Sequence, residues 1–596
     1  MAEASEFARN WLESLRRLSR NAHVILSVLA VLVGVAAGVA AIGFRYAIDG
    51  FQRLGFGFGG EQVVTELAAA PWWRVLVVPL FGGLAVGLFV RFLMPERRPH
   101  AVADVIEANA LRGGRMSLTT GLKAALVSAA SIGTGASVGR EGPVVHLGAS
   151  LGAWVAKRLH LSRMASRTLL GCGVAAAIAA SFNAPIAGTF FALEVVVGHY
   201  AMSAFAPIVI AAVLGTLISR MHYGDFPAFI VPEMGITSFW EFPAFALLGL
   251  VSALVAVLFI YSAALSERVF QRLRIRPWLR PAAAGLVLGV IGLRFPHVLG
   301  VGYEATDAAL SGLYSLWLLL LLIVLKTAAT GLSLGAGFGG GVFSPSLFIG
   351  AMVGGAFGII ATGAFPELSS GQSAYTIVGM GAVAGAVLGA PISTVLMVFE
   401  LTNDYAITIA VMIATAIASL IVQQGFGRSF FTWQLERRGI SIRGGQDIGL
   451  LRSIRARDIM NANYQTIRPD APIAEVRERL PGAPWGELFV VDAEQRLRGI
   501  ITFADMQEAA FDTSHDAEWV AGDVARGRPT VLGASDDLER AIQAYGASGE
   551  ATLPVVESRE SMRLVGVARE HEMMLAYHRA LEQARGEERG DERGGL

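Results

Sequence analysis

The chain has 596 residues, of which 54% are hydrophobic and only 16% are charged, and its formal net charge is zero. Soluble proteins carry about 25% charged residues, so this composition excludes an ordinary soluble protein and indicates a polytopic helical membrane protein. Zero net charge gives no electrostatic basis for a nucleic-acid partner. The single cysteine, Cys172, excludes an internal disulfide, and its apolar surroundings predict a small core residue.

The N-terminal segment, residues 1–22, is charged and amphipathic, and no cleavable signal peptide is visible in it. Its arginines, the last of them Arg20, precede the first apolar run, which favours a cytoplasmic N-terminus. From there the chain is apolar and rich in glycine and alanine, and we predict a transmembrane domain over residues 23–435. The composition then becomes that of a soluble protein, which places a domain boundary at about 435–450.

The predicted transmembrane domain contains two pairs of similar segments. "GREGPVVHLGASLG" (139–152) and "GVFSPSLFIGAMVG" (341–354) share the positions of one proline and three glycines. "APIAGTFFALE" (184–194) and "APISTVLMVFE" (390–400) share Ala-Pro-Ile and a final glutamate. Two matched blocks in the same order indicate a duplicated core, and such transporter-like folds place the binding site between the halves near the midplane of the membrane.

Both segments of the first pair predict helix starts. Pro143 and Pro345 suit the first helical turn, and the glycine-rich segments before them can run extended with their amides pointing at a ligand. A helix start carries partial positive charge, so two of them facing each other would form an anion site from backbone alone. Glu141 lies at one start and can occupy that site itself, with Arg140 as a rim charge or local partner. The alternative is that Glu141 is a solvated loop residue.

The motifs GREGP and GVFSP and the paired Ala-Pro-Ile blocks resemble those of the CLC family of chloride channels and proton/chloride antiporters. The resemblance implies a homodimer with one pore per subunit, in which each subunit has two inverted halves of broken, tilted helices, at about 23–222 and 240–435. It implies chloride as the transported ligand, a bacterial-type inner membrane, cytoplasmic termini and Glu141 as the gating glutamate. It assigns the anion site to Gly139, Arg140, Gly142, Val342 and Phe343.

Two positions of the inner anion site differ from the pattern of the family. The family motif Gly-Ser-Gly-Ile-Pro corresponds to "PHAVA" (99–103), which puts His100 in place of the anion-coordinating serine. His100 either donates a hydrogen bond to the anion or faces water at the cytoplasmic mouth. Near the end of the domain, Phe431 takes the position of a tyrosine whose hydroxyl touches the inner anion, and phenylalanine has no donor. Phe431 is expected to line the pore or pack in the core.

A third difference concerns proton coupling. Antiporters of the family usually carry a glutamate pair at the end of the first Ala-Pro helix, whereas this chain has Glu194 followed by Val195, which cannot carry a proton. We therefore expect a passive voltage- or pH-gated chloride channel; the alternative is a proton/chloride antiporter with a different proton path. Glu194 and Glu400 are expected to be structural, although Glu194 could substitute as the proton stop. His146 is expected to be a packing or hydrogen-bonding residue rather than a ligand. The sequence has no metal-spaced cluster and no nucleophile elbow, so we predict no enzyme activity, no metal and no required cofactor.

The soluble part, residues 450–580, contains two repeats of strand, amphipathic helix, strand, turn, strand and helix, at about 455–512 and 520–578. The repeats resemble a CBS pair, an α/β regulatory module. The first repeat has the Gly-x-x-Thr-x-x-Asp pattern that ends at Thr502 and Asp505, and in CBS domains such a segment can bind adenine nucleotide. The second repeat lacks the pattern, and a purely structural, dimer-bracing module is the alternative. Residues 581–596 are predicted to be a disordered tail.

Overall fold

The computed structural model describes residues 22–225, 229, 231–232, 235–438, 440, 454–506, 516 and 518–589. These residues belong to two compact units, one within residues 1–441 and the other within 442–591, a division that falls inside the predicted boundary at 435–450. The arginines of the predicted N-terminal segment and residues 590–596 of the predicted tail lie outside the described residues.

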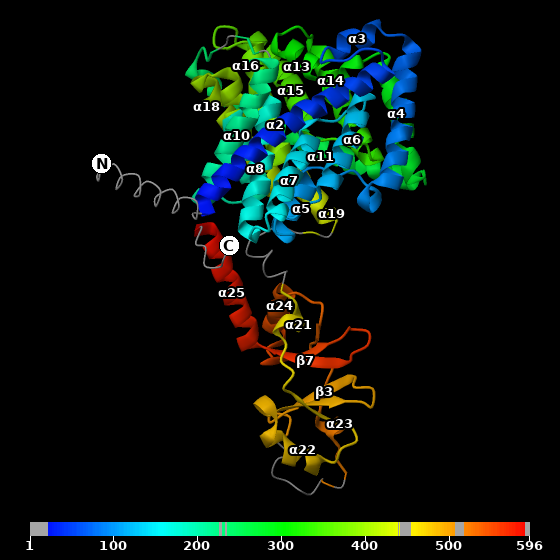
Figure 1. Cartoon of the computed structure of the whole chain (residues 1–596), viewed down its shortest axis with the longest axis vertical. Coiled ribbons are helices and arrows are strands. Elements are labelled where there is room, and N and C mark those ends of the chain that lie inside the picture. The colour runs from blue at the N-terminus through cyan, green and yellow to red at the C-terminus, as the bar shows by residue number, and fades with distance from the viewer. Residues whose placement is uncertain are drawn as a thin grey trace, which may run out of the picture. The chain divides into compact units, whose positions relative to one another are not determined.

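The regular elements in the described part of the first unit are all helices (Figure 1). Eight of the described helices are long and apolar enough to cross a membrane. The α-helices are α2 (Ala22–Gly55), α3 (Val63–Ala69), α4 (Trp72–Leu93), α5 (Val102–Leu111), α6 (Leu118–Gly133), α7 (Glu141–Arg158), α8 (Arg163–Phe182), α9 (Pro185–Phe191), α10 (Met202–Tyr223), α11 (Phe242–Arg272), α12 (Arg280–Gly292), α13 (Tyr303–Leu310), α14 (Leu316–Ala336), α15 (Phe343–Ala364), α16 (Gln372–Leu388), α17 (Pro391–Thr402), α18 (Tyr405–Ile421) and α19 (Phe430–Arg437). Short 3-10 turns are η1 (Pro95–Arg97), η3 (Phe239–Glu241), η4 (Pro277–Leu279) and η5 (Pro296–Val298), and π-helical turns are η2 (Ala192–Val197) and η6 (Val422–Phe426).

The helices of the first unit pack in two similar sets. α2 packs against α8 and α10, and α11 packs in the same way against α16 and α18. α7 packs against α8, α15 packs against α16, and α9 and α17 contact each other. The pairs α7–α15 and α9–α17 hold the segments that match in sequence, so the packing repeats where the sequence does.

The centre of the unit consists of α8 and α16, whose side chains are almost all buried. Both helices are rich in glycine and alanine, which lets neighbouring backbones approach closely, as is common between membrane helices. A Cβ atom on Gly148 of α7 would lie only 2.2 Å from the carbonyl oxygen of Gly173 in α8. The glycine content of these segments therefore sets the close packing that holds the two helix starts of the site in place.

The second unit is a small α/β unit with two similar sheets. In the first, β1 (Gln465–Ile467) runs parallel to β2 (Glu487–Val491), which is antiparallel to β3 (Leu497–Thr502), and β3 pairs with β4 (Arg526–Gly527). In the second, β5 (Leu532–Gly533) is parallel to β6 (Thr552–Val556), which is antiparallel to β7 (Leu564–Arg569). Both antiparallel pairs shift register near the end of the second strand, at Val490/Val491 and Val555/Val556.

The helices of this unit lie between and after the strands. They are α21 (Ala456–Ile459), α22 (Ile473–Arg479), α23 (Ala521–Val524), α24 (Leu538–Ser548) and α25 (Glu570–Arg589), with 3-10 turns η7 (Leu480–Gly482) and η8 (Pro484–Gly486). The order strand, helix, strand, strand is the same in both repeats, as the sequence predicts. The tail differs from the prediction, because α25 continues helically to Arg589. Its "LEQARGEER" end is rich in glutamate, arginine and alanine, which are good helix formers as well as common residues of disordered segments.

Candidate functional site

The starts of α7 and α15 meet at the centre of the helical unit. The backbone amide of Gly139 donates to the carbonyl of Gly341 at 2.7 Å, and the amide of Gly341 donates back to Gly139 at 2.7 Å. These two glycines occupy the same position in the repeated motif. Pro143 and Pro345 both lie in the first turn of their helices, as predicted. A Cβ at Gly139 would lie 2.7 Å from a carboxylate oxygen of Glu141, so the Glu141 carboxylate would have to shift.

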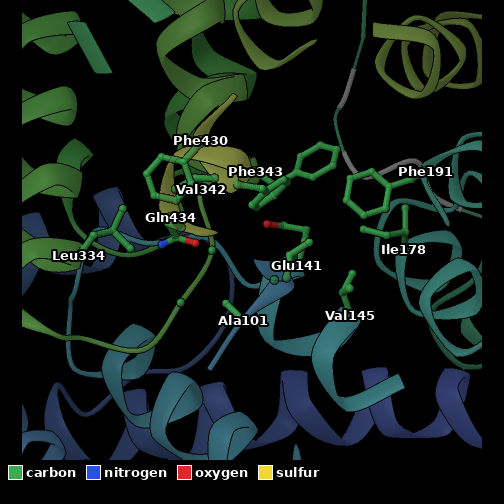
Figure 2. A pocket seen from close by; sticks show the side chains of 15 residues that line it. Ala101, Glu141, Val145, Ile178, Phe191, Leu334, Val342, Phe343, Phe430 and Gln434 are labelled. Atoms are coloured by element: carbon green, nitrogen blue, oxygen red, sulfur yellow. The ribbon is translucent and has the colours of Figure 1, made fainter. Parts of the chain in front are cut away.

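A small cavity lies beside this junction. The starts of four helices contribute to its wall: Ala101 and Val102 at α5, Glu141 and Gly142 at α7, Val342 and Phe343 at α15, and Phe430, Phe431 and Gln434 at α19. Glu141 is the sole ionisable side chain among the described residues of the wall. Figure 2 shows it projecting into the cavity toward Phe343, between Phe430 and Gln434 on one side and Phe191 and Ile178 on the other. Helix starts carry partial positive charge, so the cavity is suited to hold an anion.

The carboxylate of Glu141 is held at the start of α15. The hydroxyl of Ser344 donates to one oxygen, and the backbone amide of Ser344 lies 3.3 Å from the other. The hydroxyl of Tyr303, the first residue of α13, donates to Glu141 at 2.8 Å. The side chain is buried, with 1% of its surface exposed. Glu141 thus occupies a position where a backbone amide and two hydroxyls would otherwise be available to a mobile anion, and the solvated-loop alternative is wrong.

Arg140 lies outside the cavity wall, on the other side of Tyr303. Its guanidinium stacks over the Tyr303 ring at 4.4 Å from the centroid and forms an ion pair with Glu61 at 2.7 Å. Arg140 and Glu61 line a second pocket together with Arg45, Asp49 and Tyr303. We call it the outer pocket, because it lies on the side of Tyr303 away from the central cavity. Glu61 lies in the loop after α2, where burial tends to raise its pKa but Arg140 and Arg45 outweigh this effect, so the pKa lies below the ordinary value. Arg140 is therefore paired with Glu61 beside the cavity, and it is absent from the cavity wall although the family resemblance assigned it to the anion site.

His100 is not brought into the cavity wall, although its neighbour Ala101 is. The ring is 8% exposed, and its Nδ1 lies 3.4 Å from a carboxylate oxygen of Asp104. It packs edge-on against His146, with 5.7 Å between the ring centroids. This placement matches neither a residue that faces the anion nor one that faces water, because the extended backbone before α5 brings the ring beside the Asp104 carboxylate. Phe431 does line the cavity and is 5% exposed.

Glu194, which follows α9, binds the start of α17, and Glu400, which lies in α17, binds the start of α9. The carboxylate of Glu194 accepts from the amides of Ile392 (3.1 Å) and Ser393 (2.8 Å) at the start of α17. The carboxylate of Glu400 accepts from the amides of Ile186 (2.9 Å) and Ala187 (2.7 Å) at the start of α9. A carboxylate at a helix start stabilises the helix by hydrogen bonding and by its charge. Val195, the next residue, is half-buried in η2. The exchange of caps between the two halves favours the structural role that we expected for both glutamates.

The Thr502–Asp505 segment of the second unit is a closed turn. One carboxylate oxygen of Asp505 accepts from the amide (2.8 Å) and the hydroxyl (2.7 Å) of Thr502. The other oxygen pairs with Arg526 of β4 at 3.1 Å. A ribose that bound to Asp505 would therefore have to compete with Arg526. Among the described residues, no group of three or more His, Cys, Asp or Glu side chains is placed to hold a metal ion.

Four further residues complete the site and were not among the expected ones, namely Glu61, Tyr303, Ser344 and Gln434. Ser344 lies within the GVFSP motif, so the motif itself was a usable signal for it. Tyr303 is 162 residues from Glu141 in the chain and stands in no repeated segment, so nothing local marked it. Glu61 follows a glycine-rich stretch that resembles an ordinary loop.

Comparisons with known proteins agree with this architecture. A family model described as voltage gated chloride channel matches residues 82–423, and a CBS domain model matches residues 456–512. A ClcB-like chloride channel protein of Ralstonia nicotianae is 33% identical over 390 residues, covering 65% of this chain and 91% of the relative. The voltage-gated ClC-type chloride channel ClcB of Escherichia coli is 30% identical over 397 residues, covering 66% of this chain and 94% of the relative.

The fold is also that of a solved structure described as a slow cyanobacterial Cl⁻/H⁺ antiporter. That structure superposes with a TM-score of 0.63 at 22% identity, over 69% of this chain and 97% of the other. The family model spans more than half of the sequence, and the matched range contains the starts of α5, α7 and α15 at the cavity. The chain is thus an integral membrane protein with a CBS domain, and it belongs to the voltage-gated chloride channel family, the CLC family.

Proposed function

We propose that this protein is a gated chloride channel in which Glu141 closes the pathway and chloride flows passively when Glu141 leaves. The observation that carries the proposal is the position of the Glu141 carboxylate at the start of α15, on the Ser344 amide and hydroxyl. An ionised carboxylate and a chloride ion compete for the same donors and the same partial positive charge. Protonation of Glu141, or a high chloride concentration, should therefore favour the open state.

Gly139, Gly142, Val342 and Phe343 are proposed to form the anion site together with the start of α5. Support comes from the four helix starts around the cavity, because backbone dipoles can stabilise an anion without a buried cation. Phe431 is proposed to form the apolar inner wall. Because Phe431 has no donor, the anion on that side would be held by Ala101 backbone, Gln434 and water. His100 is proposed to act only indirectly, by fixing Asp104 at the start of α5.

The second candidate is a Cl⁻/H⁺ antiporter, which the similarity in fold to the slow cyanobacterial Cl⁻/H⁺ antiporter favours. Coupled transport of chloride and protons would need a second protonatable group that exchanges protons with the membrane side opposite the outer pocket. Position 195 is a valine, and both oxygens of Glu194 accept hydrogen bonds from α17, which argues against that role. We therefore place passive conduction first.

Paired chloride and proton fluxes in liposomes distinguish these two functions. We expect the purified full-length protein to release chloride without driving protons uphill. Val195→Glu, which introduces a protonatable group at the position of the missing relay, is the matched variant. Glu141→Gln gives the chloride flux when residue 141 has no charge with which to close the pathway. A fixed, non-zero proton-to-chloride ratio that is sustained against a proton gradient in the unmodified protein would contradict the channel proposal and assign the relay to Glu194 or to water.

We also propose a homodimer with one pore per subunit, in a bacterial-type inner membrane and with both termini cytoplasmic. The bacterial relatives support the membrane assignment. The beginning of α2 and the helix α19 lie at the same edge of the helical unit, while α3 lies at the opposite edge (Figure 1). Cysteine accessibility at positions 2 and 450 in oriented membranes tests the orientation, and cross-linking in liposomes tests the dimer.

The CBS module is proposed to bind an adenine nucleotide through Thr502 and Asp505, with dimer bracing as the alternative. Arg526 already neutralises Asp505, so Arg526→Ala should strengthen binding if the ribose hydroxyls use that carboxylate. Calorimetry on the full-length protein with ATP, ADP and AMP tests this. No heat from the unmodified protein or from the Arg526→Ala variant would leave the module with the bracing role.

A further inference from the structure

Two arginines in the outer pocket converge on one oxygen of one carboxylate. Nη1 of Arg140 and Nη2 of Arg45 lie 2.7 and 2.9 Å from the same Oε1 atom of Glu61. Guanidinium N–H groups that converge on one point form a ready donor set for a small anion. In this structure the carboxylate of Glu61 occupies that point.

The pocket lies directly next to the gate. Tyr303 lines the outer pocket, carries Arg140 over its ring, and donates its hydroxyl to Glu141 in the central cavity. The outer pocket and the central cavity therefore lie on the two sides of one tyrosine. An anion bound to the two arginines would be placed next to the residues that open and close the pathway.

The partners of this ion pair differ in their freedom to move. The Arg140 side chain is 11% exposed and stacked on Tyr303, whereas the Glu61 side chain is 41% exposed. The loop that carries Glu61 is fixed at both ends: the amide of Gly60 donates to the Gln52 side chain at 3.2 Å, and the amide of Val64 donates to Glu304 at 2.6 Å. Rotation of its own side chain is thus the simplest way for the Glu61 carboxylate to leave the arginines.

The charges that remain when Glu61 rotates away suit a monovalent ligand. The ionisable side chains that line the pocket are Arg45, Asp49, Glu61, Arg140 and Tyr303. Without Glu61, two arginines and one aspartate leave a single positive charge, with Tyr303 neutral. One monovalent anion neutralises that charge, whereas a divalent anion would reverse it.

We propose that Arg45 and Arg140 form an outer binding site for a small monovalent anion, and that Glu61 is a tethered anion that fills this site until a free anion displaces it. With chloride as the ligand, the inference rests on the proposed function and adds an entry site before the Glu141 gate. Glu61 then sets how much outer chloride is needed to load the pathway, while Glu141 sets whether the pathway is open.

The first test is the dependence of flux on outer chloride. For Glu61→Gln we expect the outer chloride concentration at half-maximal flux to fall about three- to tenfold, the range that follows from removing two partly exposed charge pairs. Adding Arg45→Gln to that variant should reverse the fall. The matched control is Glu66→Gln, which removes the same charge from exposed surface of the adjacent helix α3. Equal half-maximal concentrations for Glu61→Gln and the unmodified protein would overturn the inference.

The second test does not require transport. Crystals of the Glu61→Gln protein grown in bromide should show anomalous density between the Arg45 and Arg140 guanidinium groups, and this density should be weaker in the unmodified protein. If the protein carries no chloride at all, the proposed function fails, yet the bromide density still decides whether the outer site exists. Anomalous density that is absent from this position in the variant would rule out the site.

Discussion

The hydroxyl of Tyr303 offers a direct test of how Glu141 is held closed. Tyr303→Phe removes the donor that lies 2.8 Å from the Glu141 carboxylate but keeps the ring between Arg140 and Phe229. A hydrogen bond to a charged group contributes about 1.5–3 kcal/mol. Because both Ser344 donors remain, we expect the lower end, and about 1.5 kcal/mol corresponds to a shift of about tenfold in the closed-to-open equilibrium.

The measurement is chloride efflux from liposomes at neutral pH, together with single-channel open probability in planar bilayers. The variant should open more at neutral pH and show a smaller further gain on acidification, since the closed state has lost part of its stabilisation. Tyr46→Phe is the control, because it removes a hydroxyl that is hydrogen-bonded to His222 at 2.7 Å on the exposed surface. Wild-type open probability in Tyr303→Phe, alongside a raised value in Glu141→Gln, would refute the idea that this hydroxyl holds the gate.

Three further predictions concern the carboxylates of Glu141, Glu194 and Glu487. Glu141→Gln should raise open probability and flatten the pH dependence, since glutamine carries no charge at any pH to compete with chloride; unchanged pH and chloride dependence in recordings would mean that Glu141 is not the gate. Glu194→Gln should lower the free energy of unfolding of the detergent-solubilised protein by about 1 kcal/mol, the scale of a lost helix cap, which a thermal melt would detect. The chloride flux per molecule should stay the same, whereas a role of Glu194 as proton stop would change the ratio of proton to chloride flux. In the second unit, burial raises the pKa of the Glu487 carboxyl above its ordinary value of 4.5. The folded state therefore binds this proton more tightly than the unfolded state, and its stability decreases as pH rises from about 4.5 through the folded pKa. Glu487→Gln should remove that decrease, which amide hydrogen exchange of β2 at pH 5 and pH 8 in the full-length protein would detect; an identical pH dependence in both proteins would contradict it.

The sequence by itself determined the class of protein, the duplicated core and the central residue of the site. These features follow from local properties: apolar length decides which segments suit a membrane, and proline with glycine fixes where α7 and α15 begin. Glu141 was marked because a charge next to an uncharged run is rarely retained without a role. The repeat also predicted that Gly139 and Gly341 are equivalent, and the structure pairs them.

Only the tertiary structure decided which side chains contact one another across the fold. Tyr303 reaches Glu141 from a distant helix start, Arg140 turns outward to Glu61, and Glu194 and Glu400 each cap a helix of the opposite half. The ring of His100 lies beside Asp104, although the family resemblance left it either at the anion or facing water. A helix start depends on a few adjacent residues, whereas a contact across 162 residues depends on how whole helices pack, and close packing of glycine-rich helices leaves no signal at the residues that it brings together.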